Sequence, residues 1–343
     1  MKNNKFMRIV ALVLLTALVS SALVGCKNED QVVSKNKTYY DFFDTVCTIY
    51  DYTGGSEDEF RQVYTHFENR LDFYHQRFDI YHEYDGVNNI ATINKNAGIS
   101  PVKVDAEVIK FLEFAVEMHE LTNGNVNIAM GSVLSIWHDY RTRGTEIPPM
   151  DKLSAAAEHT DISKMIIDKE NSTVYLSDPE MSLDVGAIAK GYTAEMIAES
   201  LVGYGITSYV IDLGGNLRAI GTKKNGEEWK TGVQNPNPSS DEPYVYYMYI
   251  SDTSVVTSGD YQRYYTVDGK NYHHIINKDT LMPSDYFSSV TIVTKHSGLA
   301  DALSTALFNM SYEDGLALVS SIDNTSVVWV RHNGELLKYG FDE

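Results

Sequence analysis

The order of its secondary-structure signals constrains the fold of this chain more than any other feature. Strand-like and helix-like segments follow one another without a regular β-α-β alternation. A doubly wound parallel sheet requires that alternation, so we expect an α+β fold of mixed sheets with flanking helices. The sequence shows no internal repeat, and 343 residues are compatible with a single large domain.

The individual elements are predicted from periodicity, capping residues and turn residues. Residues 39–52 are rich in β-branched and aromatic side chains, which predicts one strand. Ser56 and Glu59 have the spacing of a capping box, and apolar residues at helical spacing follow them. Further helices are expected from Asp105, over residues 187–201 and over 299–310, with a hairpin over 164–177 and strands over 208–213, 244–251, 255–256, 287–294, 327–331 and 336–339.

The N-terminus has the pattern of a secretory signal. Lys2, Lys5 and Arg8 precede an apolar run over residues 9–24, which ends in Leu-Val-Gly-Cys26. This ending resembles a bacterial lipobox, in which the cysteine is lipidated and becomes the mature N-terminus. The alternative is an uncleaved anchor, for which the run is short beside the ~20 residues of a spanning helix. The predicted organisation is a signal peptide at 1–25, a lipid-anchored tether at 26–38 and a folded domain at 39–343, held on the outer face of the cell membrane.

The charge of the chain excludes one class of partner. The formal net charge is −19, and removal of residues 1–25 takes away three positive charges and lowers it to −22. A nucleic-acid partner is not expected, because phosphate backbones are bound by clustered Lys and Arg. A phosphate-bearing ligand would therefore be bound by backbone amides, a few local cations or a metal ion. With Cys26 acylated, only Cys47 remains, so no intramolecular disulfide is expected.

Two glycine-bearing segments invite a nucleotide-binding interpretation, although neither matches a P-loop or a dinucleotide-binding fingerprint. Asp184 and Lys190 lie six residues apart at a predicted helix start, where free amides and a cation favour an anion. A tight turn with a surface lysine is equally compatible with this spacing. The segment 212–216 (DLGGN) ends a predicted strand with two glycines that permit close backbone approach, although an ordinary turn has the same pattern.

Two further segments carry side chains suited to catalysis. His273 and His274 are adjacent on a predicted strand, so they point to opposite faces and at most one enters a given pocket. A near-neutral imidazole can act as a general base. Asp301 and Thr305 lie four residues apart on one helical face and offer hard oxygen ligands suited to Mg²⁺. A satisfied core histidine and a buried Asp–Thr hydrogen bond remain the structural alternatives.

Taken together, these segments closely resemble the ApbE family of FAD:protein FMN transferases. The segments that carry the resemblance, in register, are 183–192 (LDVGAIAKGY), 212–216 (DLGGN), 257–261 (TSGDY), 272–276 (YHHII) and 300–306 (ADALSTA). Weaker similarity at 43–45, Tyr81, 92–94 and from 122–124 through Trp137 extends it over nearly the whole mature chain.

The resemblance implies a reaction and a set of site residues. Enzymes of this family require Mg²⁺, split FAD with release of AMP, and attach FMN through a phosphoester bond to a threonine of a target protein. The resemblance implies that the Ala187 carbonyl, Asp301 and Thr305 hold the metal, and that His273 or His274 is the base. The implied FAD contacts are Phe43, Tyr81, Asn125, Val126, Asn127, Asp184, Lys190, His274 and Ile275.

The chain departs from the usual family pattern in three places, namely residues 43–45 (FDT), 124–128 (GNVNI) and 277–283 (NKDTLMP). These departures concern the expected flavin contacts and leave the expected metal residues in place. The expected acceptors are membrane-bound redox subunits of the Rnf or Nqr type, or exported flavin carriers. Two alternatives remain open at this stage: a Mg²⁺-dependent FAD pyrophosphatase and a non-catalytic flavin-binding lipoprotein.

Overall fold

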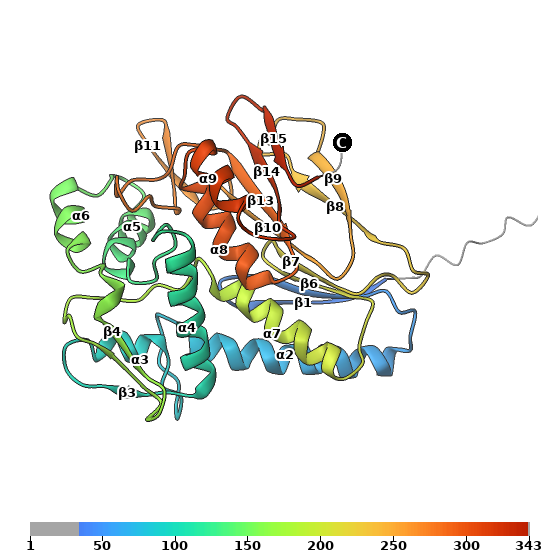
Figure 1. Cartoon of the computed structure of the whole chain (residues 1–343), viewed down its shortest axis with the longest axis horizontal. Coiled ribbons are helices and arrows are strands. Elements are labelled where there is room, and N and C mark those ends of the chain that lie inside the picture. Colours follow the sequence, from blue (N-terminus) through green and yellow to red (C-terminus); the bar gives the residue numbers. More distant parts are fainter. Residues whose placement is uncertain (1–33, 342–343) are drawn as a thin grey trace, which may run out of the picture. The chain divides into compact units, whose positions relative to one another are not determined.

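The computed structural model describes residues 34–341 (Figure 1). The predicted signal peptide, the lipidation site Cys26 and most of the predicted tether lie outside the described residues. Within residues 34–341, no helix has the length and apolar character needed to cross a membrane.

An eight-stranded sheet forms the centre of the fold, in the order β1-β2-β6-β7-β10-β13-β14-β15. Every neighbouring pair in it is antiparallel, which confirms an α+β fold and excludes a doubly wound one. The strands are β1 (Lys35–Phe42), β2 (Thr45–Asp51), β6 (Tyr209–Leu213), β7 (Asn216–Ile220), β10 (Ser254–Gly259), β13 (Ser289–Thr294), β14 (Ser326–Val330) and β15 (Leu336–Tyr339).

Other elements cover both faces of this sheet. Alternate residues of a strand point to opposite sides, so each strand contributes side chains to both faces. On β14, Val327 and Trp329 pack on the helical side, whereas Val328 and Val330 pack on the other side. The helical side is covered by α2 (Glu57–Phe78), α7 (Ala189–Gly203), α8 (Ser297–Phe308) and α9 (Tyr312–Val319). The other side is covered by the hairpin of β8 (Trp229–Gln234) and β9 (Tyr244–Ile250).

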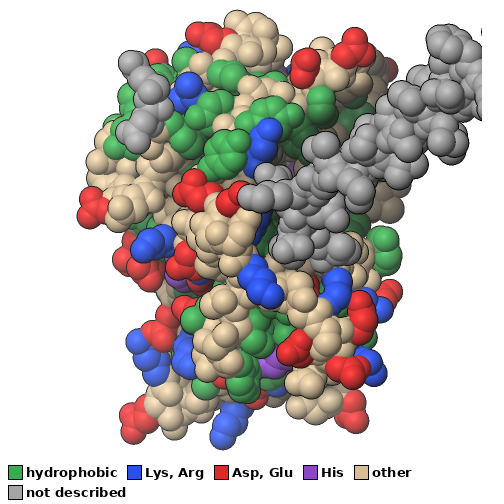
Figure 2. Space-filling view, turned by 90° about the vertical axis from the view of Figure 1, so that its right-hand side faces the viewer, with side chains coloured by type: hydrophobic (Ala, Val, Ile, Leu, Met, Phe, Trp, Pro, Cys, Tyr) green, Lys and Arg blue, Asp and Glu red, His purple; other side chains and the backbone are tan. Residues whose placement is uncertain are grey.

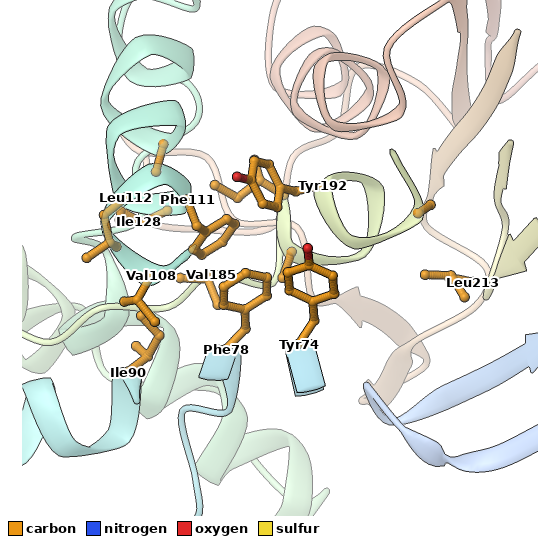
Figure 3. Packing of buried hydrophobic residues seen from close by; sticks show 14 of the residues in the cluster. Tyr74, Phe78, Ile90, Val108, Phe111, Leu112, Ile128, Val185, Tyr192 and Leu213 are labelled. Atoms are coloured by element: carbon orange, nitrogen blue, oxygen red, sulfur yellow. The ribbon is translucent and has the colours of Figure 1, made fainter. Parts of the chain in front are cut away.

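A second group of elements packs beside the C-terminal end of α2. Phe78 of α2 stacks on Phe111 at a ring separation of 4.0 Å, and Tyr192 of α7 meets Phe111 edge-on (Figure 3). The group consists of α3 (Ile90–Lys95), α4 (Ala106–Leu121), the 3₁₀ turn η2 (Ile162–Lys164) and the small sheet of β3 (Val102–Lys103), β5 (Thr173–Leu176) and β4 (Met165–Asp168). A separate cluster is formed by α5 (Gly131–Arg143), α6 (Met150–Ala157) and the two-stranded sheet of β11 (Tyr264–Val267) and β12 (Lys270–His273).

Most predicted elements are present, and the N-terminal strand is the main correction. The capping box of Ser56 and Glu59 is formed at the start of α2, as predicted. The predicted single strand over 39–52 is instead the hairpin β1–β2, turned at Phe43 and Asp44, which both have positive φ. β1 also begins at Lys35, so residues 35–38 belong to the sheet rather than to the predicted tether.

Candidate active site

One cavity of about 540 Å³ gathers polar side chains from segments far apart in the sequence. Its wall is formed by the β1–β2 turn, the end of α2, the loop before α5, the start of α7 and part of α8. A volume of this size is typical of small-molecule sites. We therefore treat this cavity as the candidate active site.

The start of α7 and the middle of α8 form one corner of the cavity. Asp301 and Thr305 lie one turn apart on α8, and both line the cavity together with Ala187. The two helices approach so closely that a Cβ at Gly191 would lie 2.4 Å from the Cβ of Asp301. With glycine there, the Gly191 N–H donates a 2.8 Å hydrogen bond to Asp301 Oδ2. The structure thus brings together the three residues expected to hold a metal.

The chemistry of this corner fits a hard divalent cation. Asp301 is only 4% exposed, and burial raises the pKa of its carboxyl group although the Lys190 ammonium lies nearby. Lys190 Nζ is 3.9 Å from Asp301 Oδ2, a distance that leaves the charge incompletely paired. The buried Asn216 Oδ1 has no hydrogen-bond partner among the described residues, while its Nδ2 lies 3.5 Å from Asp301 Oδ2. A buried carboxylate beside an unpartnered amide oxygen is a donor set that suits Mg²⁺.

Few ionisable side chains are available as ligands at this corner. Within residues 34–341, no group of three or more His, Cys, Asp or Glu side chains is placed to hold a metal ion. A cation bound here would therefore complete its shell with carbonyl, hydroxyl, water or phosphate oxygens, as Mg²⁺ does at phosphoryl-transfer sites.

The residues expected to contact FAD all lie in the wall of the same cavity. They are Phe43, Tyr81, Asn125, Val126, Asn127, Asp184, Lys190, His274 and Ile275. Asp184 Oδ1 accepts the Gly186 N–H at 2.9 Å, and burial raises the pKa of this carboxyl group. The side-chain amides of Asn125 and Asn127 donate to backbone carbonyls, so these two side chains also hold the wall in place.

The adjacent histidines have opposite environments. His274 lines the cavity, and its Nδ1 lies 3.2 Å from the Arg263 carbonyl, so Nδ1 carries the proton and Nε2 is an acceptor. Burial and the charge of Arg263 lower the pKa of His274 to about 3, which keeps the ring neutral. A neutral imidazole with an open Nε2 can accept a proton from a substrate.

His273 is a correction to the predicted pair of candidate bases. It is 7% exposed, lies outside the cavity wall and packs edge-on against Phe308. Its Nε2 donates to the Ser284 carbonyl at 2.7 Å, and its Nδ1 accepts the Ile275 N–H at 3.2 Å. Because both ring nitrogens are already bonded in the core, His273 has a structural position and His274 is the remaining candidate.

The cavity also contains cations that the sequence motifs did not indicate. Arg141 of α5 donates to His138 Nδ1, and Arg263 donates to the Asp44 carbonyl. Among the described residues, neither guanidinium group lies within 4.0 Å of a carboxylate. Burial and the charge of Arg263 lower the pKa of Arg141, as expected where two cations face one space. Two guanidinium groups without carboxylate partners form an anion-binding arrangement.

The cations of the cavity contrast with the outer surface of the molecule. On the face shown in Figure 2, Lys and Arg side chains are interspersed with Asp and Glu and form no basic patch. The two arginines lie more than a hundred residues apart in the sequence, so no local pattern could have paired them. Their proximity is a property of the folded chain.

Comparison with known proteins identifies the family of the chain. A family model described as the ApbE family matches residues 43–329. The chain is 34% identical to an FAD:protein FMN transferase from Treponema pallidum, over 70% of this chain and 70% of the relative. It is 30% identical to a protein of the same name from Klebsiella pneumoniae, over 72% of this chain and 76% of the relative.

Solved structures show the same architecture. The ApbE protein of Thermotoga maritima superposes with a TM-score of 0.79 at 26% identity, covering 89% of this chain and 96% of that one. The flavin transferase ApbE of Vibrio cholerae superposes with a TM-score of 0.72 at 23% identity, covering 89% and 97%. These relatives confirm the predicted fold and the predicted enzyme class, a transferase. With the family model matching most of its length, the chain belongs to the ApbE family.

Proposed function

We propose that this chain transfers FMN from FAD to a threonine hydroxyl of a partner protein, with Mg²⁺ as cofactor. The observation that carries the proposal is that one cavity holds a hard-oxygen corner, a neutral histidine and two arginines that have no carboxylate partner within residues 34–341. The names of the curated relatives, which are FAD:protein FMN transferases, support the choice of donor and acceptor.

The proposed step exchanges the phosphoanhydride bond of FAD for a phosphoester bond to threonine. The threonine oxygen forms a bond to the phosphorus of the FMN half, the bond from that phosphorus to the bridging oxygen breaks, and AMP leaves with the bridging oxygen. His274 accepts the threonine proton at Nε2. Arg141 and Arg263 bind the diphosphate by charge-assisted hydrogen bonds.

The remaining cavity residues position the reactants. Phe43 and Tyr81 contact the flavin, and Lys190 at the start of α7 supplies a further positive charge. Mg²⁺ would be held by Asp301, Thr305 and the Ala187 carbonyl, where its chemistry is to neutralise phosphate charge. In a strongly acidic chain, these few charges support the binding of a diphosphate without a basic surface.

The test combines the full chain in detergent, FAD, Mg²⁺ and a threonine-bearing fragment of an Rnf- or Nqr-type subunit. In-gel flavin fluorescence and the intact mass of the fragment are measured together. We expect a gain of one FMN and release of one AMP. AMP with free FMN and no adduct would indicate a pyrophosphatase instead, and intact FAD retained without AMP would indicate a flavin-binding protein.

We further propose that the chain is exported and lipid-anchored through Cys26 on the outer face of the cell membrane. The support is the basic, apolar and small-residue order of residues 1–26. The substitution Cys26→Ser should move the protein from the membrane fraction to the soluble or secreted fraction and abolish labelling by radioactive palmitate. Retention of the label in this variant would contradict the proposed site.

A further inference from the structure

A chain of hydrogen bonds runs along the wall of the cavity at its aromatic end, and His75, Asp79 and Tyr84 of this chain themselves line the cavity. The Phe43 N–H donates to His75 Nδ1 at 3.3 Å, and the Tyr84 hydroxyl lies 3.2 Å from His75 Nε2. The same hydroxyl donates to Asp79 Oδ2 at 2.7 Å, and Asp79 Oδ1 accepts the Tyr81 N–H at 2.7 Å. The chain therefore connects the backbones of the two aromatic residues that are proposed to contact the flavin.

The geometry allows only one assignment of donors and acceptors in this chain of hydrogen bonds. Because His75 Nδ1 accepts a backbone N–H, the proton of the neutral imidazole is on Nε2, which donates to the Tyr84 oxygen. Tyr84 in turn donates its own proton to Asp79, which is only 8% exposed. Burial alone would raise the pKa of Asp79, but the hydrogen bonds from Tyr81, Tyr84 and His82 lower it. The carboxylate is thus the ionised end of a fully satisfied chain.

The β1–β2 turn lies at the Phe43 end of this chain of hydrogen bonds, and it needs their support. Phe43 and Asp44 have φ values of 54° and 49°, a left-handed conformation that is uncommon for residues with a Cβ. Such turns close two-residue hairpins and usually contain glycine or asparagine. His75 binds the Phe43 N–H and Arg263 donates to the Asp44 carbonyl, so contacts from outside the hairpin hold both residues.

We propose that His75, Tyr84 and Asp79 are positioning residues that hold Phe43 and Tyr81 at the spacing required by the isoalloxazine ring. This inference rests on the proposed function, because it takes the flavin as the ligand. The three residues act through the backbone of the two aromatic residues. A flat aromatic ligand gains affinity from aromatic partners that are already in place, since their ordering then costs nothing on binding.

The test measures FAD affinity of the full chain without acceptor, by flavin fluorescence, and then KM and kcat with acceptor. Tyr84→Phe and His75→Phe should each weaken FAD binding and raise KM about tenfold, the size expected for one lost hydrogen bond in a charge-linked chain. The kcat at saturating FAD should stay within about twofold. The double variant should lose little more than the worse single variant, because both substitutions interrupt one chain.

Two further variants separate positioning from general stability. Tyr39 does not line the cavity, and its hydroxyl lies 3.2 Å from a Glu68 carboxylate oxygen. Tyr39→Phe removes this hydroxyl and should leave the affinity for FAD unchanged. His75→Gln keeps one acceptor and one donor and should recover part of the affinity lost in His75→Phe.

The outcomes distinguish this inference from the proposed function. If Tyr84→Phe binds FAD as the wild type does, or if the two single losses add in the double variant, the positioning role is wrong. If the wild type binds FAD without transferring FMN, the proposed function is wrong, while the binding series still decides the positioning role. A wild type that binds no FAD overturns both.

Discussion

The two ends of the cavity are built in different ways. At the corner formed by Asp301 and Thr305, the side chains lie on α8, which is buried along most of its length between the sheet and α7. At the aromatic end, Phe43 and Tyr81 lie on a hairpin turn and on a loop. Packing of whole helices thus positions the first pair, whereas side-chain hydrogen bonds position the second.

This difference predicts different sensitivities. A side chain on a buried helix is positioned by the many apolar contacts of that helix. A substitution can therefore alter its functional group while the backbone stays in place. A side chain on a loop depends on a few polar contacts, each of which can be removed by one substitution. We therefore expect substitutions at the Asp301 corner to lower the rate of transfer, and substitutions at the aromatic end to lower affinity for FAD.

The largest effect is expected from Asp301→Asn. The amide keeps the shape of the side chain but removes the charge that would hold the cation, so transfer should fall about a thousandfold. Stability without Mg²⁺ should be unchanged or higher, because an incompletely paired buried charge is gone. The intact mass of the acceptor and a thermal melt test this, with the exposed Asp323→Asn as the matched control. More than a tenth of wild-type activity would contradict a cation site at this corner.

The next largest effect is expected from His274→Gln, which removes the proposed base. The kcat should fall about a hundredfold. Because the pKa of His274 is about 3, the ring is neutral at both pH 6 and pH 8, and the loss should be the same at both.

His273→Gln provides the matched control for that substitution. It should lower the free energy of unfolding by about 1–3 kcal/mol, because buried hydrogen bonds are lost, and leave kcat within a few-fold of wild type. Single-turnover rates and urea unfolding curves measure both quantities. A larger loss of kcat in the His273 variant than in the His274 variant would reverse the assignment.

Gly191→Ala tests whether helix packing positions the Asp301 corner. The added Cβ would lie 2.4 Å from both the Asp301 Cβ and the Ser297 carbonyl oxygen, so the helices must separate. The free energy of unfolding should fall by about 2 kcal/mol, and transfer should fall with it. Gly203→Ala in the same helix meets no atom within 4 Å and should be neutral or stabilising by up to about 1 kcal/mol. Equal urea midpoints for the two variants would contradict close packing at Gly191.

The smallest effect is expected from Arg141→Ala. Loss of one of two cavity guanidinium groups should raise the KM for FAD about tenfold, with little change in stability. Arg143→Ala on the same helix is the control, because Arg143 pairs with Asp139 and Glu146 outside the cavity. Steady-state kinetics over a range of FAD concentrations measure the difference. Equal KM values in the two variants would remove Arg141 from the diphosphate site.

Local patterns predicted those parts of the fold whose stabilising contacts are close in sequence. The capping box of Ser56 and Glu59 marked the start of α2, and β15 was expected at its observed bounds. The strand β7, the helix α5 and the strand β11 were not predicted, and the strand expected to carry both His273 and His274 ends at His273 as β12. The β1–β2 turn was missed because Phe43 is not a typical turn residue and no glycine accompanies Asp44, while contacts from His75 and Arg263 hold both residues.

By itself, the sequence determined the α+β class, the likeness to one family and some of the residues that line the cavity. These follow from the order of apolar patterns and from short motifs, which are properties of neighbouring residues. Only the tertiary structure decided that His274 rather than His273 faces the cavity, that Arg141 joins Arg263 there, and that Asp79 supports Phe43 through two other side chains. Each of these depends on partners from distant segments, whose meeting is set by how the helices and the sheet pack together.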